Sequence, residues 1–207
     1  LVCASNCNNI LTDFFTKGVY DRRRPFYTTT SPSMDILISS NLERLLYLSM
    51  GAEKCKSLME SLNKDGVYSV SEEQRAAFAV DFAAGYCSEQ ETAQTIKAYF
   101  DKGYLCDPHT AVALYCADEY VKASGDNAPM LVASTASPYK FPQAVLTALG
   151  LNLPEDDFEC LSALERASGV CPPANLSALR DKAVCFSEVI EKTEIGDIVN
   201  GFAAVKL

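Results

Sequence analysis

The stretch VASTASPYKFP, residues 132–142, concentrates side chains that could hold a ligand. Ser134, Thr135 and Ser137 follow an apolar run, and two prolines flank a lysine and two aromatic residues. The preceding run PMLVAS is predicted to be a short strand and FPQAVLTALG a helix. In α/β proteins, ligands bind where a strand gives way to a loop and a helix. The three hydroxyls therefore either satisfy a turn or hold a ligand.

A second polar cluster lies in SPSMDILISSNLER, residues 31–44. Its polar side chains surround the start of an otherwise apolar helix predicted from Met34 onward. Turn and capping chemistry explains two or three of these groups but not all of them, so a ligand role and a local structural role both remain open. The polar residues are Ser31, Ser33, Asp35, Ser39, Ser40, Asn41 and Arg44.

The only histidine, His109, lies in CDPHTAVALYCADEY. Asp107 is predicted to cap a helix whose first position is Pro108, which places His109 in the first turn. Nothing in the sequence brings a cysteine to His109 as a nucleophile pair, so capping or packing is the favoured role. The nine cysteines include no C-x-x-C pair, which favours reduced, mostly buried thiols over disulfides or zinc.

Bulk properties limit the class of protein. The 207 residues are 48% hydrophobic and 22% charged, enough for one globular domain or a large lobe. A net charge of −9 argues against nucleic-acid binding, and the basic run at 22–24 is interpreted as a solvated loop. No run reaches the ~20 apolar residues of a membrane span and no signal segment opens the chain, so a soluble, cytoplasmic protein is expected. Because Leu1 already belongs to a predicted strand, LVCAS, we expect that a preceding part has been lost.

The predicted elements define a helix-rich α/β class. Gly18 is placed to end the helix around NNILTDFF, RPFYTTTSP is expected to be extended, and AEKCKSLMESL places apolar residues on one helical stripe. Two capping boxes, Ser71 with Gln74 and Ser88 with Glu91, should open helices, and Gly103 should close the second. A helix over DDFECLSALERASG, which starts at an acidic pair, and a last strand over KAVCF complete the prediction.

Three motifs in order carry a family resemblance. TTTSPSMDILISSNLERLL, LCDPHTAVALY and VASTASPYKFPQAV resemble the C-terminal half of threonine synthase, a pyridoxal-phosphate (PLP) enzyme of fold type II, the tryptophan-synthase-β-like fold. LVCASNCNNILTDFFTKGVYDRR resembles the segment just before them. The resemblance runs from residue 1 to about 150, with a weaker tail to Leu207. It implies a partial enzyme lobe divided into core (1–51), a helical insertion (52–103), a core strand and helices (104–150) and a C-terminal helical and strand tail (151–207).

The resemblance implies an activity of amino-acid biosynthesis. The intact enzyme would be a lyase that converts O-phospho-L-homoserine and water to L-threonine and phosphate, with PLP as electron sink. The family's Schiff-base lysine lies upstream of anything in this chain, so no catalytic residue is assigned here. The fragment is therefore expected to be inactive without the N-terminal part of the same enzyme, and to self-associate through the apolar face left exposed.

The resemblance also implies site residues. The family's Ser-Thr-Ala threonine bonds the pyridine nitrogen of PLP and corresponds to Thr135, with Ser134 and Ser137 as further cofactor neighbours. Many members carry His-Pro-Ala-Lys-Phe where this chain has SPYKF, which removes the imidazole at position 137. Ser33, Asn41 and Arg44 are assigned to the substrate phosphate, because a helix N-terminus with hydroxyls and a guanidinium suits an anion.

Two other classes remain as alternatives. One is a non-catalytic ligand-binding or assembly module of the same fold, for which the absence of the lysine segment would be normal. The other is an unrelated thiol-dependent enzyme, which predicts one cysteine much more reactive than the rest.

Overall fold

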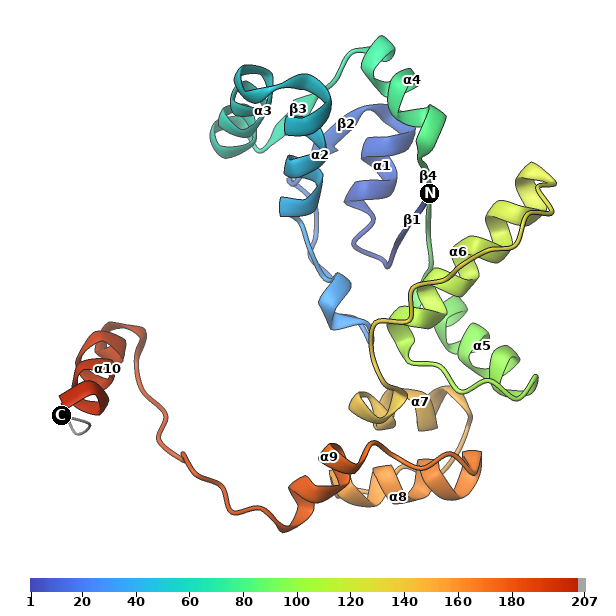
Figure 1. Cartoon of the computed structure of the whole chain (residues 1–207), viewed down its shortest axis with the longest axis vertical. Helices are drawn as coiled ribbons and strands as arrows, with labels where there is room; N and C mark the ends of the chain where they lie inside the picture. The colour runs from blue at the N-terminus through green and yellow to red at the C-terminus, as the bar shows by residue number, and fades with distance from the viewer. Residues whose placement is uncertain (205–207) are drawn as a thin grey trace. The chain divides into compact units, whose positions relative to one another are not determined.

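The computed structural model describes residues 1–204, which fall into two compact units, 1–173 and the described residues from Ala174 onward. The first unit is helix-rich with two small sheets, as the predicted class requires (Figure 1). Its strands are β1 (Val2–Ser5), β2 (Val19–Asp21), β3 (Val67–Ser69) and β4 (Ala83–Tyr86). Its helices are α1 (Ile10–Lys17), α2 (Ser40–Met50), α3 (Ala52–Asp65), α4 (Glu72–Asp81), α5 (Glu89–Phe100), α6 (Pro108–Ser124), α7 (Pro142–Ala148) and α8 (Asp157–Ser168).

A short parallel sheet positions the polar motifs. β1 pairs with β4 in a register that sets Val2 opposite Ala83 and Ser5 opposite Tyr86. Helices α1 and α6 both pack against this sheet, and Thr12 of α1 donates to the Gly85 carbonyl at 2.9 Å. The carboxyl ends of β1 and β4 therefore lie together, where β1 leads into residues 6–9 and β4 leads into Cys87 and Ser88 at the start of α5.

The second sheet belongs to the main hydrophobic core. β2 and β3 are antiparallel, and Tyr20 and Tyr68 face each other with stacked rings 5.1 Å apart. Phe14 of α1 contacts both tyrosines edge-on, and apolar faces of α2, α3 and α4 close the cluster. The core consists of Ile10, Phe14, Tyr20, Leu42, Leu46, Cys55, Leu58, Leu62, Tyr68 and Phe78.

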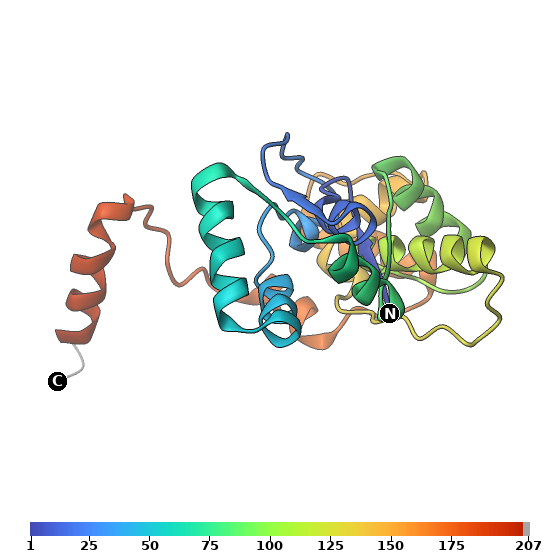
Figure 2. The same ribbon diagram turned by 90° about the horizontal axis from the view of Figure 1, so that it is seen from above.

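Both predicted capping boxes are present. The Ser71 side chain accepts from the Gln74 backbone N–H at the start of α4, and Ser88 accepts from Glu91 at the start of α5. Helix α5 packs along α6 (Figure 2), and Tyr115 of α6 donates to Glu91 at 2.6 Å. Hydrogen bonds from the Ser88 hydroxyl and from Tyr115 lower the pKa of Glu91. The N-terminal capping box of α5 is therefore hydrogen-bonded to α6.

Most predicted helix ends are confirmed. Gly18 ends α1 and Gly169 ends α8, each in the left-handed region that glycine tolerates without strain. Helix α5 ends at Phe100, and Gly103 follows in the turn with a φ of 87°. The acidic pair opens α8, where Asp156 accepts from the Glu159 backbone N–H at 2.8 Å.

Three sequence-based predictions of secondary structure are wrong. PMLVAS is not a strand: residues 129–136 are irregular, because an apolar run becomes a strand only where another strand offers backbone partners. KAVCF is irregular for the same reason. The helix expected from Met34 begins at Ser40, because the chain first makes a short 3-10 turn, η1 (Pro32–Met34), and Ser39 supplies the cap by accepting from Leu42.

The division implied by the resemblance is not tested by these elements, but two observations bear on it. Residues 52–103 contain β3 and β4, which pair with β2 and β1, so this segment is part of both sheets as well as helical. Residues 1–173 form one compact unit, whereas the elements described from Ala174 to Ala204 are short helices, the last being α10 (Ile195–Ala204). The final three residues of the predicted tail lie outside the described residues.

The Glu91–Tyr115 hydrogen bond predicts a dependence of stability on pH. Glu91 has a lowered pKa in the folded state, so its contribution is complete above its unfolded value near 4.5 and is lost as pH falls through the folded value. Tyr115→Phe removes one donor and raises the pKa of Glu91 toward the ordinary range. We expect the variant to lose less unfolding free energy than wild type between pH 7 and pH 3, measured by urea denaturation.

Tyr47→Phe is the matched control, because the exposed Tyr47 hydroxyl makes no hydrogen bond in the described chain. Parallel curves of stability against pH for Tyr115→Phe and wild type would contradict the prediction.

Candidate functional site

A buried carboxylate stands at the N-terminus of α6. Asp107 is fully buried and caps the helix by accepting from the backbone N–H of His109 at 2.9 Å. The same carboxylate contacts the His109 imidazole, with Nδ1 to Oδ1 at 2.9 Å, and accepts a hydrogen bond from the Thr110 hydroxyl. Pro108 at the first helical position fits here because its missing N–H is not needed.

This carboxylate connects the two polar motifs found in the sequence. His109 Nε2 accepts the backbone N–H of Ser33 at 3.2 Å. On the other side, the Thr110 hydroxyl lies 3.0 Å from the Ser134 hydroxyl. Ser33 and Ser134, which are 101 positions apart in the chain, are therefore joined through one buried Asp–His–Thr group.

The loop with the Ser-Thr-Ala motif uses two of its three hydroxyls internally. Ser134 contacts Thr110, and Ser137 accepts from the Tyr139 backbone N–H at 3.3 Å, which caps the 3-10 turn η2 (Pro138–Lys140). Thr135 is exposed, and its hydroxyl makes no hydrogen bond within residues 1–204. Of the three predicted cofactor neighbours, Thr135 is the one whose hydroxyl is available to a ligand.

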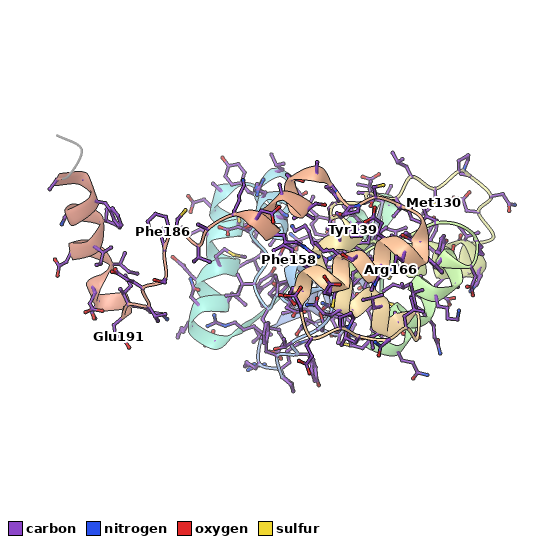
Figure 3. The ribbon with its side chains drawn as sticks, turned by 90° about the horizontal axis from the view of Figure 1, so that it is seen from below. Met130, Tyr139, Phe158, Arg166, Phe186 and Glu191 are labelled. Carbon is purple, nitrogen blue, oxygen red and sulfur yellow. The ribbon has the colours of Figure 1, made fainter. Side chains whose placement is uncertain are left out.

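Tyr139, labelled in Figure 3, anchors this loop. Its ring is 3% exposed, and its hydroxyl donates to the Val170 carbonyl and lies 3.3 Å from the Ser168 hydroxyl at the end of α8. Burial raises the pKa of Tyr139, which keeps the phenol protonated as a donor. The loop is therefore held at both ends, at Ser134 and at Tyr139.

The three residues assigned to substrate are less closely grouped. Ser33 lies in η1, one hydrogen bond from His109, whereas Asn41 and Arg44 lie in the first turns of α2. Asn41 lines a hollow of about 270 Å³ with apolar walls, and Arg44 lines a different one of about 450 Å³. All three side chains are exposed and make no hydrogen bond within the described residues. The structure thus leaves them available but does not place Asn41 and Arg44 in one pocket.

Sequence reasoning missed a buried polar network at the end of β1. The Asn6 amide donates to Thr29 at 2.8 Å and to Asp35 at 2.7 Å, and Asn8 donates to Asp35 at 3.0 Å. Asn6 is fully buried, and Ser31, also fully buried, accepts from it at 3.0 Å. These bonds explain much of the polar cluster at 31–44 structurally. The signal was three asparagines in SNCNN directly after a strand, where buried amides require partners.

The cysteines provide no evidence for a thiol site. All nine are free, and Cys55, Cys87, Cys106, Cys116 and Cys160 are buried. Burial raises the pKa of the Cys87, Cys106 and Cys116 thiols to about 12, the opposite of what a nucleophile needs. Across residues 1–204, no group of histidine, cysteine or acidic side chains is placed to hold a metal ion. Among the same residues, no helix has the length and apolarity to cross a membrane.

Comparison with known proteins gives consistent matches. The family model described as "Threonine synthase, C-terminal" matches residues 110–182. The human protein named threonine synthase-like 1 is 40% identical over 152 residues, covering 72% of this chain and 20% of that protein. Threonine synthase of Saccharomyces cerevisiae is 36% identical over 166 residues, covering 72% of this chain and 32% of that enzyme.

Two solved structures match the fold. PLP-bound threonine synthase from Brucella melitensis superposes with a TM-score of 0.80 at 37% identity, covering 97% of this chain and 40% of that one. The yeast threonine synthase structure gives 0.81 at 29% identity, covering 100% and 42%. The chain spans about a fifth of the first relatives and about two fifths of the solved enzymes. In sequence and in fold, the chain is therefore similar to part of threonine synthase, and the matching family model describes the C-terminal region of that enzyme.

Proposed function

We propose that this chain supplies the C-terminal part of a PLP-dependent threonine synthase acting on O-phospho-L-homoserine. The observation that carries the proposal is the Asp107 group, which joins the Ser33 segment and the Ser134–Thr135 loop into one site. These are the two motifs assigned to substrate and cofactor. A site that holds substrate and cofactor side by side requires the two motifs to be fixed relative to each other.

The free hydroxyl of Thr135 fits PLP. A ring nitrogen that is not protonated accepts a hydrogen bond, and Thr135 is the motif hydroxyl without an internal partner. Ser134 and Ser137, engaged with Thr110 and Tyr139, would hold the loop at the cofactor's edge. When bound, PLP supplies the electron sink for removing protons next to the substrate's amine. The contribution of Thr135 is to orient the ring and keep its nitrogen nearer the neutral form.

The substrate phosphate is proposed to meet the segment that leads into α2. The Ser33 hydroxyl and the Asn41 amide can donate to phosphate oxygens, and the N-terminus of α2 adds free backbone N–H groups. Arg44, one turn further along, supplies positive charge if the phosphate reaches that face. Ser33 is the strongest of the three assignments, because its backbone is tied to the same group as the cofactor loop.

The proposed enzyme needs more protein than this chain contains. The chain spans about two fifths of the solved threonine synthases, and no residue of it is assigned as the lysine that would hold PLP covalently. We propose that the chain alone is inactive and that it binds the remainder of the enzyme or a second copy of itself. A cytoplasmic location remains a prediction.

An apolar surface supports the association. β1, α6 and residues 130–133 surround a hollow of about 530 Å³, beside which Leu131 is 99% exposed. Met130, next to it, is seen in Figure 3. In the described chain β1 pairs with β4 alone, so its other edge has backbone groups that a further strand could pair with.

A non-catalytic module of the same fold is the second candidate. It is favoured by one observation: the human relative at 40% identity is named threonine synthase-like 1, whereas the yeast threonine synthase is 36% identical. Such a module would keep anion or PLP binding without forming threonine. The following experiments separate the two candidates.

Thr135→Ala in the full-length protein should retain the fold but lower turnover. The loss of one hydrogen bond to the ring is worth about 1–3 kcal/mol, and Thr135→Ser should restore most of it because the hydroxyl is kept. Steady-state formation of threonine from phosphohomoserine, together with the absorbance of bound PLP, measures both effects. Thr147→Ala, an exposed threonine on α7, is the control. Wild-type turnover in Thr135→Ala would remove Thr135 from the site.

Reduction with borohydride tests the incompleteness of the chain. The purified chain is mixed with PLP, reduced and digested, and labelled lysines are mapped by mass spectrometry. We expect low labelling spread over exposed lysines such as Lys140, and no threonine formed. One lysine labelled stoichiometrically, together with threonine formation, would show that the chain is a complete enzyme.

Inorganic phosphate tests the anion site. In a titration followed by backbone amide shifts, wild type should respond at Ser33 and around Asn41. Asn41→Ala or Arg44→Ala should weaken the response severalfold if its side chain contacts the anion. Arg166→Ala is the control, because Arg166 is an exposed helical arginine on α8 (Figure 3). An equal loss in Arg166→Ala would indicate nonspecific attraction.

A further inference from the structure

We propose that His109 and Thr110 are positioning residues that fix the two ligand-binding loops to one support, the carboxylate of Asp107. His109 holds the Ser33 segment through its Nε2 atom, and Thr110 holds the Ser134–Thr135 loop through its hydroxyl. The relative position of the two loops is then set at the first turn of α6. The inference depends on the proposed function only for the identity of the ligands.

The two contacts of the imidazole fix its tautomer. The Ser33 backbone N–H can only donate, so His109 Nε2 must present a lone pair. The proton of the neutral imidazole therefore resides on Nδ1. This atom lies 2.9 Å from the Asp107 carboxylate, and an ionised carboxylate can only accept a hydrogen bond. The contacts to Ser33 and to Asp107 both fit the neutral Nδ1–H tautomer. The Nε2–H tautomer would lose the hydrogen bond from the Ser33 N–H.

Packing holds the ring in that orientation. His109 is 6% exposed, and its ring centroid lies 4.8 Å from that of Phe141. Phe141 directly follows η2, at the end of the loop that carries Thr135. The imidazole thus contacts the Ser33 segment by a hydrogen bond and the end of the loop that carries Thr135 by ring packing.

Capping of α6 does not explain these side chains. The cap uses the Asp107 carboxylate and the backbone N–H groups of His109 and Thr110, which any residues at positions 109 and 110 other than proline would provide. The imidazole and the Thr110 hydroxyl make additional bonds, and each leads to a different loop. Side-chain variants at positions 109 and 110 therefore keep the backbone N–H bonds of the cap while removing the side-chain bonds.

Nuclear magnetic resonance on the full chain tests the proposal directly, since His109 is the only histidine and its ring signals need no assignment. Long-range ¹H–¹⁵N correlation should show the Nδ1–H tautomer. His109→Leu should raise the hydrogen-exchange rate of the Ser33 amide roughly tenfold, the effect of losing one hydrogen bond. His109→Gln, whose amide oxygen can accept in place of Nε2, should recover part of that protection.

Thr110→Val keeps the shape of the side chain and removes the hydroxyl. It should change amide shifts at Ser134 and Thr135 while leaving the Ser33 exchange rate within about twofold of wild type. Protection of amides in the middle of α6 verifies that each variant is folded. If His109→Leu does not fold, the wild-type tautomer and His109→Gln still decide the question.

The proposal is overturned if wild-type His109 is in the Nε2–H form, or if Ser33 exchange is unchanged in a folded His109→Leu. The phosphate titration separates this result from the proposed function. Weaker phosphate binding at Ser33 in His109→Leu supports both ideas. A correct tautomer and altered Ser33 exchange in a chain that binds no phosphate would retain the positioning role and reject the proposed anion site.

Discussion

The arrangement of the candidate site depends on the burial of one carboxylate. Asp107 has no exposed surface, so every oxygen lone pair that it cannot share with water must be satisfied by a protein donor. The backbone N–H groups at the start of α6 satisfy some, and the His109 and Thr110 side chains satisfy others. Because an unpaired buried charge is costly, these donors are held in place, and the groups bonded to them are held in turn. The position of both the Ser33 segment and the Ser134–Thr135 loop follows from this one requirement.

A second buried network, at the end of β1, holds the segment that precedes Ser33. Residues 22–31 contain no helix or strand, yet Thr29 and Ser31 are held by the Asn6 amide, and Thr29 also donates to Asp35 at 2.6 Å. Buried side-chain bonds therefore replace the regular backbone ladder in this segment. Because Ser33 lies between Ser31 and Asp35, its position is set from two directions, by Asn6 through its neighbours and by His109 through its own N–H.

Local features were predictable from the sequence and long-range ones were not. The capping boxes at Ser71 and Ser88 and the cap at Asp107 involve residues two or three positions apart, so the residue types are sufficient to predict them. A strand at PMLVAS requires a distant partner, which no local pattern can supply. The link from His109 to Ser33 spans 76 positions and rests on a single backbone N–H, which any residue except proline carries, so residue types give no sign of it.

The resemblance to threonine synthase indicates a region for the candidate site, and the structure bears on which atoms of that region have partners within the protein. It assigned three hydroxyls of one motif to the cofactor, but two of them, on Ser134 and Ser137, already have partners within the protein. It assigned three residues of another motif to the phosphate, but Asn41 and Arg44 line separate hollows. A serine or threonine that holds a loop cannot be told from one that binds a ligand by its residue type alone. The contacts distinguish them, since a hydroxyl that satisfies the protein has less to offer a ligand, and by that criterion Thr135 and Ser33 are the residues on which the proposed chemistry depends.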